Sequence, residues 1–199
     1  MKTKLNLGCG ADYRPGWINV DHPRAVTRKD VAHDLDKCPW PFADGSADEI
    51  YMGSTLEHLT FPDEKVREVW RLLKPGGVFY GTVPYGRADG AMYVMEHRQF
   101  FTEKSFDMFC ADASGKTRCE YLFPEPLFKM ERVRLKRESN TWRTRLRCLI
   151  PFPSVLTYFI SNLYDDVEFR LTKLPAVKGQ SPSSLTPSST NPLIYHCNV

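Results

Sequence analysis

Short segments with the character of β-strands recur through the first half of the chain, and several of them end at a glycine or an acidic residue. They are Lys4 to Leu7, Trp17 to Asp21, Asp30 to Leu35, Asp48 to Met52 and Val78 to Val83. Between the last two, Pro62 to Leu73 repeats its apolar residues at the three- and four-residue spacing of a helix, and Lys74-Pro75-Gly76-Gly77 stops it. Alternating strands and helices favour an α/β domain with a mostly parallel sheet and helices on both faces.

The connection between the first two strands is unusually short. Only Ala11 to Gly16 separates them, and it contains Arg14-Pro15-Gly16. A parallel crossover with its own helix needs about a dozen residues or more. If these strands are parallel neighbours, a tight loop or a single helical turn must join them.

The second half of the chain has a different pattern of predicted helices and strands. A helix is expected from Thr102 to about Cys110, with Phe106 and Phe109 facing inward. Phe128 to Lys136 and Val167 to Leu174 alternate with a period of two, which predicts strands and a C-terminal antiparallel pair.

Two further segments stand outside this pattern. Trp142 to Leu163 is aromatic and apolar, which favours a packed connector over a helical lid or a membrane-surface element. From Gln180 to Pro192, ten of thirteen residues are Ser, Pro or Thr. Such a composition buries too little apolar surface to fold. We therefore expect one domain over residues 1–175 and a disordered tail without catalytic role over residues 176–199.

Charge and cysteine content exclude several classes of protein. The net charge of +3 does not by itself imply a polyanionic partner, although seven Lys or Arg face two Glu between Glu131 and Arg147. The alternation of Arg132, Arg134 and Lys136 with apolar residues favours an edge strand with a charged outer face over a patch for phosphate, nucleic acid or anionic lipid. Six cysteines without a C-x-x-C pair argue against a zinc site or a disulfide framework.

The chain also lacks the signals of export. No apolar run approaches the roughly 18 residues of a membrane span, and the first residues lack the apolar stretch and cleavage site of a signal peptide. A cytoplasmic location is expected.

The ends of the first three strands carry residues suited to a nucleotide. Gly8 and Gly10 permit close approach of the backbone to a ligand at the carboxyl edge of the sheet. A dinucleotide fingerprint requires a third glycine, and Tyr13-Arg14-Pro15 stands there, so NAD is disfavoured. Asp21 can accept both hydroxyls of a ribose. Asp34-Leu35, followed by Pro39-Trp40-Pro41-Phe42, offers a carboxylate, an amide and an aromatic wall for an adenine.

The ordered set of motifs resembles a known family, the class I S-adenosylmethionine-dependent methyltransferases, and most closely the type called methyltransferase domain 11. The resemblance covers about residues 4 to 110. It rests on Leu5-Asn6-Leu7-Gly8-Cys9-Gly10, Asn19-Val20-Asp21, His33-Asp34-Leu35, Pro39-Trp40-Pro41-Phe42, Asp48-Glu49-Ile50-Tyr51, Leu56-Glu57-His58-Leu59 and Leu72-Leu73-Lys74-Pro75-Gly76-Gly77. It implies a Rossmann-like fold, S-adenosyl-L-methionine as cofactor and methyl transfer as the reaction.

Carried over by position, the resemblance implies a role for each strand end. The glycine turn would hold the methionine part of the cofactor, Asp21 the ribose, and Asp34 with Leu35 the adenine. Two residues after the fourth strand would lie near the sulfonium and the acceptor. Asn6 carries an amide where the family often has an acid before the turn. This amide would form a hydrogen bond with the cofactor's amino group, but with less electrostatic attraction. The cofactor-binding set is thus Asn6, Gly8, Cys9, Gly10, Asp21, Asp34, Leu35, Gly53 and Ser54.

Methyl transfer from a sulfonium mainly requires alignment, and a base is needed only if the acceptor must lose a proton. Candidate catalytic residues are His58, His97 and Tyr85. Some small-molecule O-methyltransferases hold a divalent metal with an E-x-x-E-H pattern at the position of Ser54 to His58. The first acid is missing here, so no metal is expected, and local structural roles are favoured for Glu57 and His58.

The acceptor stays open at this stage. A sugar or lipid-linked glycan is preferred, then a small metabolite, then nucleic acid, and peripheral contact with a membrane is compatible with the aromatic segment. One alternative is another nucleotide-binding Rossmann enzyme, such as an oxidoreductase. Another is a degenerate methyltransferase-like module that binds a partner through the basic segment from Arg134 to Arg147.

Overall fold

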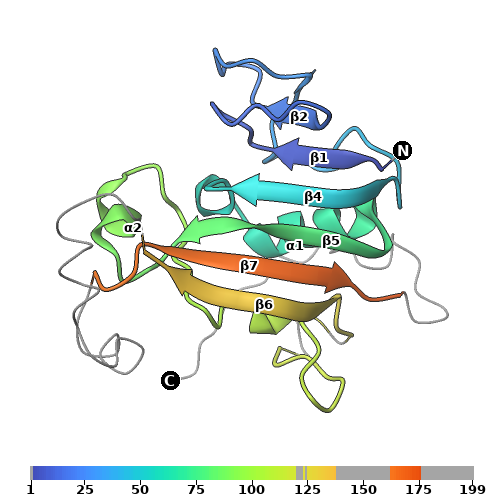
Figure 1. Ribbon diagram of the computed structural model, residues 1–199, viewed down its shortest axis with the longest axis vertical. Coiled ribbons are helices and arrows are strands. Elements are labelled where there is room, and N and C mark those ends of the chain that lie inside the picture. The colour runs from blue at the N-terminus through green and yellow to red at the C-terminus, as the bar shows by residue number, and fades with distance from the viewer. Residues whose placement is uncertain (1, 120–122, 124, 138–161, 176–199) are drawn as a thin grey trace, which may run out of the picture.

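Seven strands form one sheet in the computed structural model of the chain, which describes residues 2–119, 123, 125–137 and 162–175 (Figure 1). Their order across the sheet is β3-β2-β1-β4-β5-β7-β6. Strands β1 to β5 are parallel, and β7 runs antiparallel to both β5 and β6. The predicted α/β class, with a mostly parallel sheet and an antiparallel C-terminal pair, is confirmed. The bounds are β1 (Lys4–Leu7), β2 (Ile18–Asp21), β3 (Val31–Ala32), β4 (Ala47–Gly53), β5 (Leu73–Pro84), β6 (Phe128–Lys136) and β7 (Asp166–Lys173).

The helix α1 (Pro62–Leu72) connects β4 to β5 and lies behind them in Figure 1. Pro62 suits its first turn, and two acidic residues there favour the positive end of the helix dipole. Val66, Val69 and Leu72 are buried against the sheet. The other helices of the described residues are short: η1 (Leu56–His58), α2 (Asp89–Tyr93) and η2 (Asp107–Phe109). Among those residues, no helix has the length and apolar character that a membrane span requires.

A loop, not a helix, joins β1 to β2, as the short spacing predicts. The buried side chain of Asn19 holds this loop. Its Nδ2 donates to the carbonyls of Arg14 and Trp17 at 3.0 and 3.1 Å, and its Oδ1 accepts from the main-chain N–H of Arg14 at 2.9 Å. One side chain thus supplies bonds that a helix would supply from its own backbone.

The connection from β2 to β3 is also without a helix. The face of β4 and β5 opposite α1 therefore presents Tyr51 and Tyr80, both partly exposed. Arg14 from the first loop lies over the Tyr51 ring, 3.4 Å from its centroid. On the α1 face, by contrast, Phe79 and Phe169 are fully buried in the core.

Two predicted elements are wrong in extent. The expected helix from Thr102 to Cys110 contains only turns and the three-residue η2. Phe106 and Phe109 are buried as expected, but the carbonyl of Phe109 accepts from Leu127 and Cys110 bridges to Phe128, which ends any helix. The expected strand from Asp30 to Leu35 shrinks to β3, because its last residues turn away from β2.

Of the three remaining predictions for the second half of the chain, two fall on residues that the structure does not describe. The aromatic segment from Trp142 to residue 161 lies outside the described residues, and so does the tail after residue 175. The basic strand β6 is an edge strand with exposed Arg132, Arg134 and Lys136, which confirms the interpretation of its alternating charges.

Candidate functional site

A cavity of about 870 Å³ opens at the carboxyl edge of the parallel strands, where open α/β sheets bind ligands. The ends of β1, β2 and β4 and the turn after β3 form its walls. Six of the nine predicted cofactor-binding residues line it, although they come from four separate parts of the chain: Gly8, Gly10, Asp21, Asp34, Leu35 and Ser54. His58, a predicted catalytic residue, lies on the same wall as Ser54.

The two glycines of the turn after β1 have different roles. Both have a positive φ, +70° at Gly8 and +47° at Gly10. A β-carbon on Gly8 would lie 2.4 Å from the side chain of Thr55, whereas one on Gly10 would meet nothing within 4 Å. Gly8 is therefore required for packing within the protein, and Gly10 leaves space open at the cavity.

Asp21 closes the glycine turn and faces the cavity. One carboxylate oxygen, Oδ2, accepts the main-chain N–H of Gly10 at 2.9 Å and the hydroxyl of Thr27 at 3.1 Å. The other, Oδ1, accepts the main-chain N–H of His22 at 2.7 Å. The Cys9 thiol also donates to Oδ2, at 3.9 Å, whereas Oδ1 accepts one bond and retains a lone pair for a ligand hydroxyl.

Asp34 lies across the cavity from the glycine turn. Partial burial raises its pKa, but the N–H of Asp36 and the nearby ammonium of Lys37 more than offset this, so that the pKa of Asp34 is below its ordinary value. Its Oδ2 is 3.5 Å from Lys37 Nζ. This carboxylate is ionised at neutral pH and can accept hydrogen bonds from a ligand.

Three other predicted cofactor residues do not line the cavity. The Nδ2 of Asn6 donates to the carbonyl of Asp12 at 2.7 Å and to Asn19 at 2.9 Å, and its buried Oδ1 has no partner. The Cys9 thiol is buried, which raises its pKa. A β-carbon on Gly53 would lie 2.5 Å from the Tyr51 hydroxyl. The structure gives these three residues packing contacts around the site.

The expected aromatic wall is also part of the core. Trp40 is 2% exposed, and its Nε1 donates to the carbonyl of Leu35 at 3.1 Å. Its main-chain N–H donates to Glu68 of α1 at 2.6 Å. Trp40 thus supports the cavity wall from behind, through Leu35.

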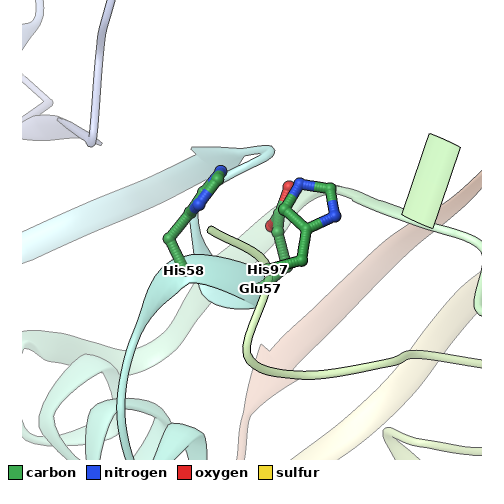
Figure 2. Close-up of side chains that lie close together, drawn as sticks. All are labelled: Glu57, His58 and His97. Carbon is green, nitrogen blue, oxygen red and sulfur yellow. The ribbon is translucent and has the colours of Figure 1, made fainter. Parts of the chain in front are cut away.

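The candidate catalytic residues are divided by the fold. Tyr85 is 2% exposed, its ring centroid lies 6.5 Å from that of Tyr164, and it does not line the 870 Å³ cavity. His58 and His97 come together instead, with ring centroids 4.8 Å apart (Figure 2). Burial, together with His97, lowers the pKa of His58, so its imidazole is neutral at neutral pH.

Glu57 joins these two histidines. Its side chain is fully buried, and neither carboxylate oxygen has a hydrogen-bond partner. Burial raises the pKa of Glu57 to about 7, with a further contribution from Asp166. The expectation that Glu57 pairs locally is therefore wrong. Sequence reasoning missed the grouping with His97, although both follow the carboxyl ends of the neighbouring parallel strands β4 and β5.

A second cavity of about 640 Å³ lies beside the first, between the start of α1 and the segment after α2. Its walls are mostly apolar and include Phe61 and Phe100, which are both more than half exposed. Arg98 lines both cavities. Its guanidinium lies 3.3 Å from Asp36, so an ion pair marks the boundary between them.

Comparisons with known proteins agree with this architecture. Residues 5–81 match the family model described as a methyltransferase domain. No curated protein matches the chain. Among solved structures, a SAM-dependent methyltransferase from Archaeoglobus fulgidus is 14% identical with a TM-score of 0.57, and the match covers 86% of each chain.

Two further structures share the fold. A methyltransferase in complex with the Haloferax volcanii Trm112 methyltransferase activator is 16% identical with a TM-score of 0.58, over 88% of this chain and 83% of that one. Phosphoethanolamine N-methyltransferase 1 from Haemonchus contortus, in complex with phosphoethanolamine and S-adenosylhomocysteine, is 14% identical with a TM-score of 0.53. That match covers 92% of this chain and 42% of that one. Residues 5–81 thus match a methyltransferase domain, and the chain shares the fold of these methyltransferases, as its motifs predict.

Proposed function

We propose that the chain binds S-adenosylmethionine in the 870 Å³ cavity and transfers its methyl group to a small or lipid-linked acceptor. The observation that supports this most strongly is the convergence of Gly10, Asp21, Asp34 and Ser54, from four separate segments, on one cavity. Its volume lies within the range of about 300 to 1,000 Å³ that is typical of small-molecule sites.

The residues on the cavity wall fit the parts of this cofactor. Gly10 has open space where a side chain would be, which suits close approach of the amino-acid part. Asp21 has acceptor capacity on Oδ1 for a ribose hydroxyl, and Asp34 with Leu35 would flank the adenine. Bound there, the cofactor supplies a methyl group on a positively charged sulfonium. We assign Asn6, Cys9 and Gly53 to supporting the turn rather than to direct contact.

Acceptor chemistry centres on the wall formed by Ser54 and His58. A neutral imidazole can take a proton from an acceptor hydroxyl or amine, and His58 is held neutral by burial. Positioning does most of the remaining work, because an in-line displacement depends on the alignment of its reacting atoms. Tyr85 receives no role in this proposal because it lies in the core.

The adjoining apolar cavity bears on the class of acceptor. Phe61 and Phe100 offer exposed aromatic surface next to Arg98, which also borders the cofactor cavity. An acceptor with an apolar portion would bury that surface favourably. We therefore favour a lipid-linked sugar or a small apolar metabolite over nucleic acid as the methyl acceptor.

The cofactor assignment is tested by calorimetric titration of the chain with S-adenosylhomocysteine, repeated on Asp21→Asn. Loss of a charge-assisted hydrogen bond costs about 1.5 to 3 kcal/mol, so affinity should fall at least tenfold. Asp12→Asn is the matched control, because Asp12 is exposed, pairs with Arg14 and lies outside the cavity. Absence of binding by the unaltered chain at millimolar ligand would refute the proposal.

A different function is favoured by one observation at the other edge of the sheet. Arg132, Lys136 and Arg170 line a 280 Å³ hollow on the face opposite α1. A chain that binds no cofactor but retains nucleic acid or anionic vesicles, with an affinity that falls as salt rises, would be a partner-binding module.

A further inference from the structure

Three side chains able to bind a metal ion meet beside the cofactor cavity, which one of them, His58, lines. Glu57 and His58 belong to the short helix η1, which follows β4, and His97 belongs to the segment that follows α2 (Figure 2). One ligand atom from each lies within 4.8 Å of the other two. Donors bound to one ion at about 2.0 to 2.2 Å are separated by roughly 3 to 3.5 Å, so small side-chain rotations bring the set to binding distance.

The Glu57 carboxylate is the strongest indication that something is bound here. It is fully buried, and both of its oxygens lack a hydrogen-bond partner. Only its own main-chain N–H lies close enough to favour the charged form. Buried polar groups in native proteins nearly always have a partner, and a buried carboxylate without one costs several kcal/mol. A cation at this point would supply the missing partner.

His97 is oriented as metal-bound histidines commonly are. His97 Nδ1 lies 2.9 Å from the carbonyl oxygen of Ala91, to which it can donate its proton. When one ring nitrogen donates to a carbonyl, the other is left with its lone pair free, and metal-bound histidines are commonly held in this way.

We propose that Glu57, His58 and His97 bind one divalent transition-metal ion. Two imidazoles and one carboxylate suit Zn²⁺, Mn²⁺, Fe²⁺ or Co²⁺ better than Mg²⁺ or Ca²⁺, which prefer oxygen ligands. Three protein ligands leave coordination positions open. Because His58 lines the cofactor cavity, the open positions face the space assigned to the acceptor.

This location has a consequence for the acceptor, which rests on the proposed methyl transfer. An ion at His58 would hold an acceptor through an oxygen atom and lower the pKa of its hydroxyl. His58 itself would then bind the ion and not the proton. The acceptor class that fits is a hydroxyl compound whose oxygen can bind a transition metal.

The test begins with metal binding by the full chain, without any substrate. After treatment with EDTA and removal of the chelator, the protein is titrated calorimetrically with Zn²⁺ and with Mn²⁺. We expect one equivalent to bind, and we expect Glu57→Gln and His97→Ala each to weaken binding at least tenfold. His33→Ala is the matched control, because His33 contacts Lys37 outside the cluster and should leave affinity unchanged.

Thermal unfolding keeps the test independent of any variant that folds poorly. Glu57→Gln replaces an unpartnered buried carboxylate with a neutral amide, so the apo form of this variant should be at least as stable as the unaltered chain. An ion that binds only the folded state raises the melting temperature with its concentration. Zn²⁺ should stabilise the unaltered chain and His33→Ala, but not Glu57→Gln.

Two outcomes would overturn the site. One is binding of less than a tenth of an equivalent by the unaltered chain. The other is equal binding by Glu57→Gln, His97→Ala and the unaltered chain, which would place the ion elsewhere. Titration of the EDTA-treated chain with S-adenosylhomocysteine separates this inference from the proposed function. Cofactor binding without metal binding refutes the metal site alone, and metal binding without cofactor binding refutes only the methyl transfer.

Discussion

At the scale of single residues, the site depends on groups that look alike in the sequence but differ in their surroundings. Gly8 packs against Thr55, whereas Gly10 borders open space. Asp21 and Glu57 both lie beside the cavity, yet Asp21 accepts four hydrogen bonds and Glu57 accepts none from another residue. Asp21 therefore both shapes the glycine turn and offers a free acceptor position, whereas Glu57 lacks any partner from the protein.

Alanine at the two glycines should therefore have opposite effects. Gly8→Ala forces a methyl group into Thr55 at a positive φ, and we expect the free energy of unfolding to fall by about 2 to 4 kcal/mol. Gly10→Ala adds only backbone strain, about 1 kcal/mol, but places its methyl in the cavity. Urea unfolding and titration with S-adenosylhomocysteine measure the two effects. Equal loss of stability in both variants would contradict the assigned roles.

At the scale of elements, α1 joins the sheet through a buried cation. Lys173, at the end of β7, donates from Nζ to the carbonyls of Trp70 and Leu73 at 2.7 and 2.6 Å. Its ammonium also lies 4.1 Å from the centroid of the Trp70 ring. These carbonyls at the end of the helix have no partner within it, so one side chain ties the helix terminus to the strand.

The same lysine predicts a dependence of stability on pH. Burial lowers the pKa of Lys173 to about 8, well below the ordinary value of 10.5 that it regains on unfolding. Between these values the unfolded chain binds more protons, so this residue's contribution to stability rises with pH. We expect the free energy of unfolding of the unaltered chain, relative to that of Lys173→Met, to increase by about 1 to 3 kcal/mol from pH 7 to pH 10. Chemical denaturation at both pH values gives that difference. Parallel pH profiles for the two proteins would show that the lysine is not desolvated.

At the scale of the whole molecule, the sheet is completed by its last strand in sequence. Strand β7 lies between β5 and β6, and after it the N–H of Leu174 donates to the carbonyl of Leu127. The contact lies just before the predicted end of the domain at residue 175, and that boundary stays a prediction. The Ser-, Pro- and Thr-rich residues that follow lie outside the described part of the chain.

Removal of the tail should leave the domain intact. We expect a chain ending at residue 175 to bind S-adenosylhomocysteine within twofold of the full chain, with a melting temperature changed by no more than about 2 °C. The reason is that the last strand and its neighbours are retained. Circular dichroism and calorimetry check this. A chain that loses the ligand or unfolds would give residues 176–199 a structural or binding role.

The sequence by itself determined the fold class, the positions of the parallel strands and most of the predicted residues that line the 870 Å³ cavity. These features depend on local patterns, because a short apolar segment that ends in glycine or aspartate identifies a strand and the residue at its carboxyl end. In a parallel sheet all such ends lie on one edge, so Gly10, Asp21 and Ser54 could be predicted to meet without knowledge of their contacts. The short first crossover followed from spacing alone.

Only the tertiary structure decided which polar residues face the cavity and which are covered. Asn6 has the alternation of a strand residue, but the loop after β1 covers it, and Tyr85 lies under the packing of Phe101 and Tyr164. The helix predicted after Thr102 gave way to contacts with Leu127 and Phe128, distant in sequence. Glu57 and His97 meet because β4 and β5 are neighbours, and no local pattern records a contact across forty residues. Burial of one carboxylate beside two imidazoles, which carries the metal proposal, is a property of that packing.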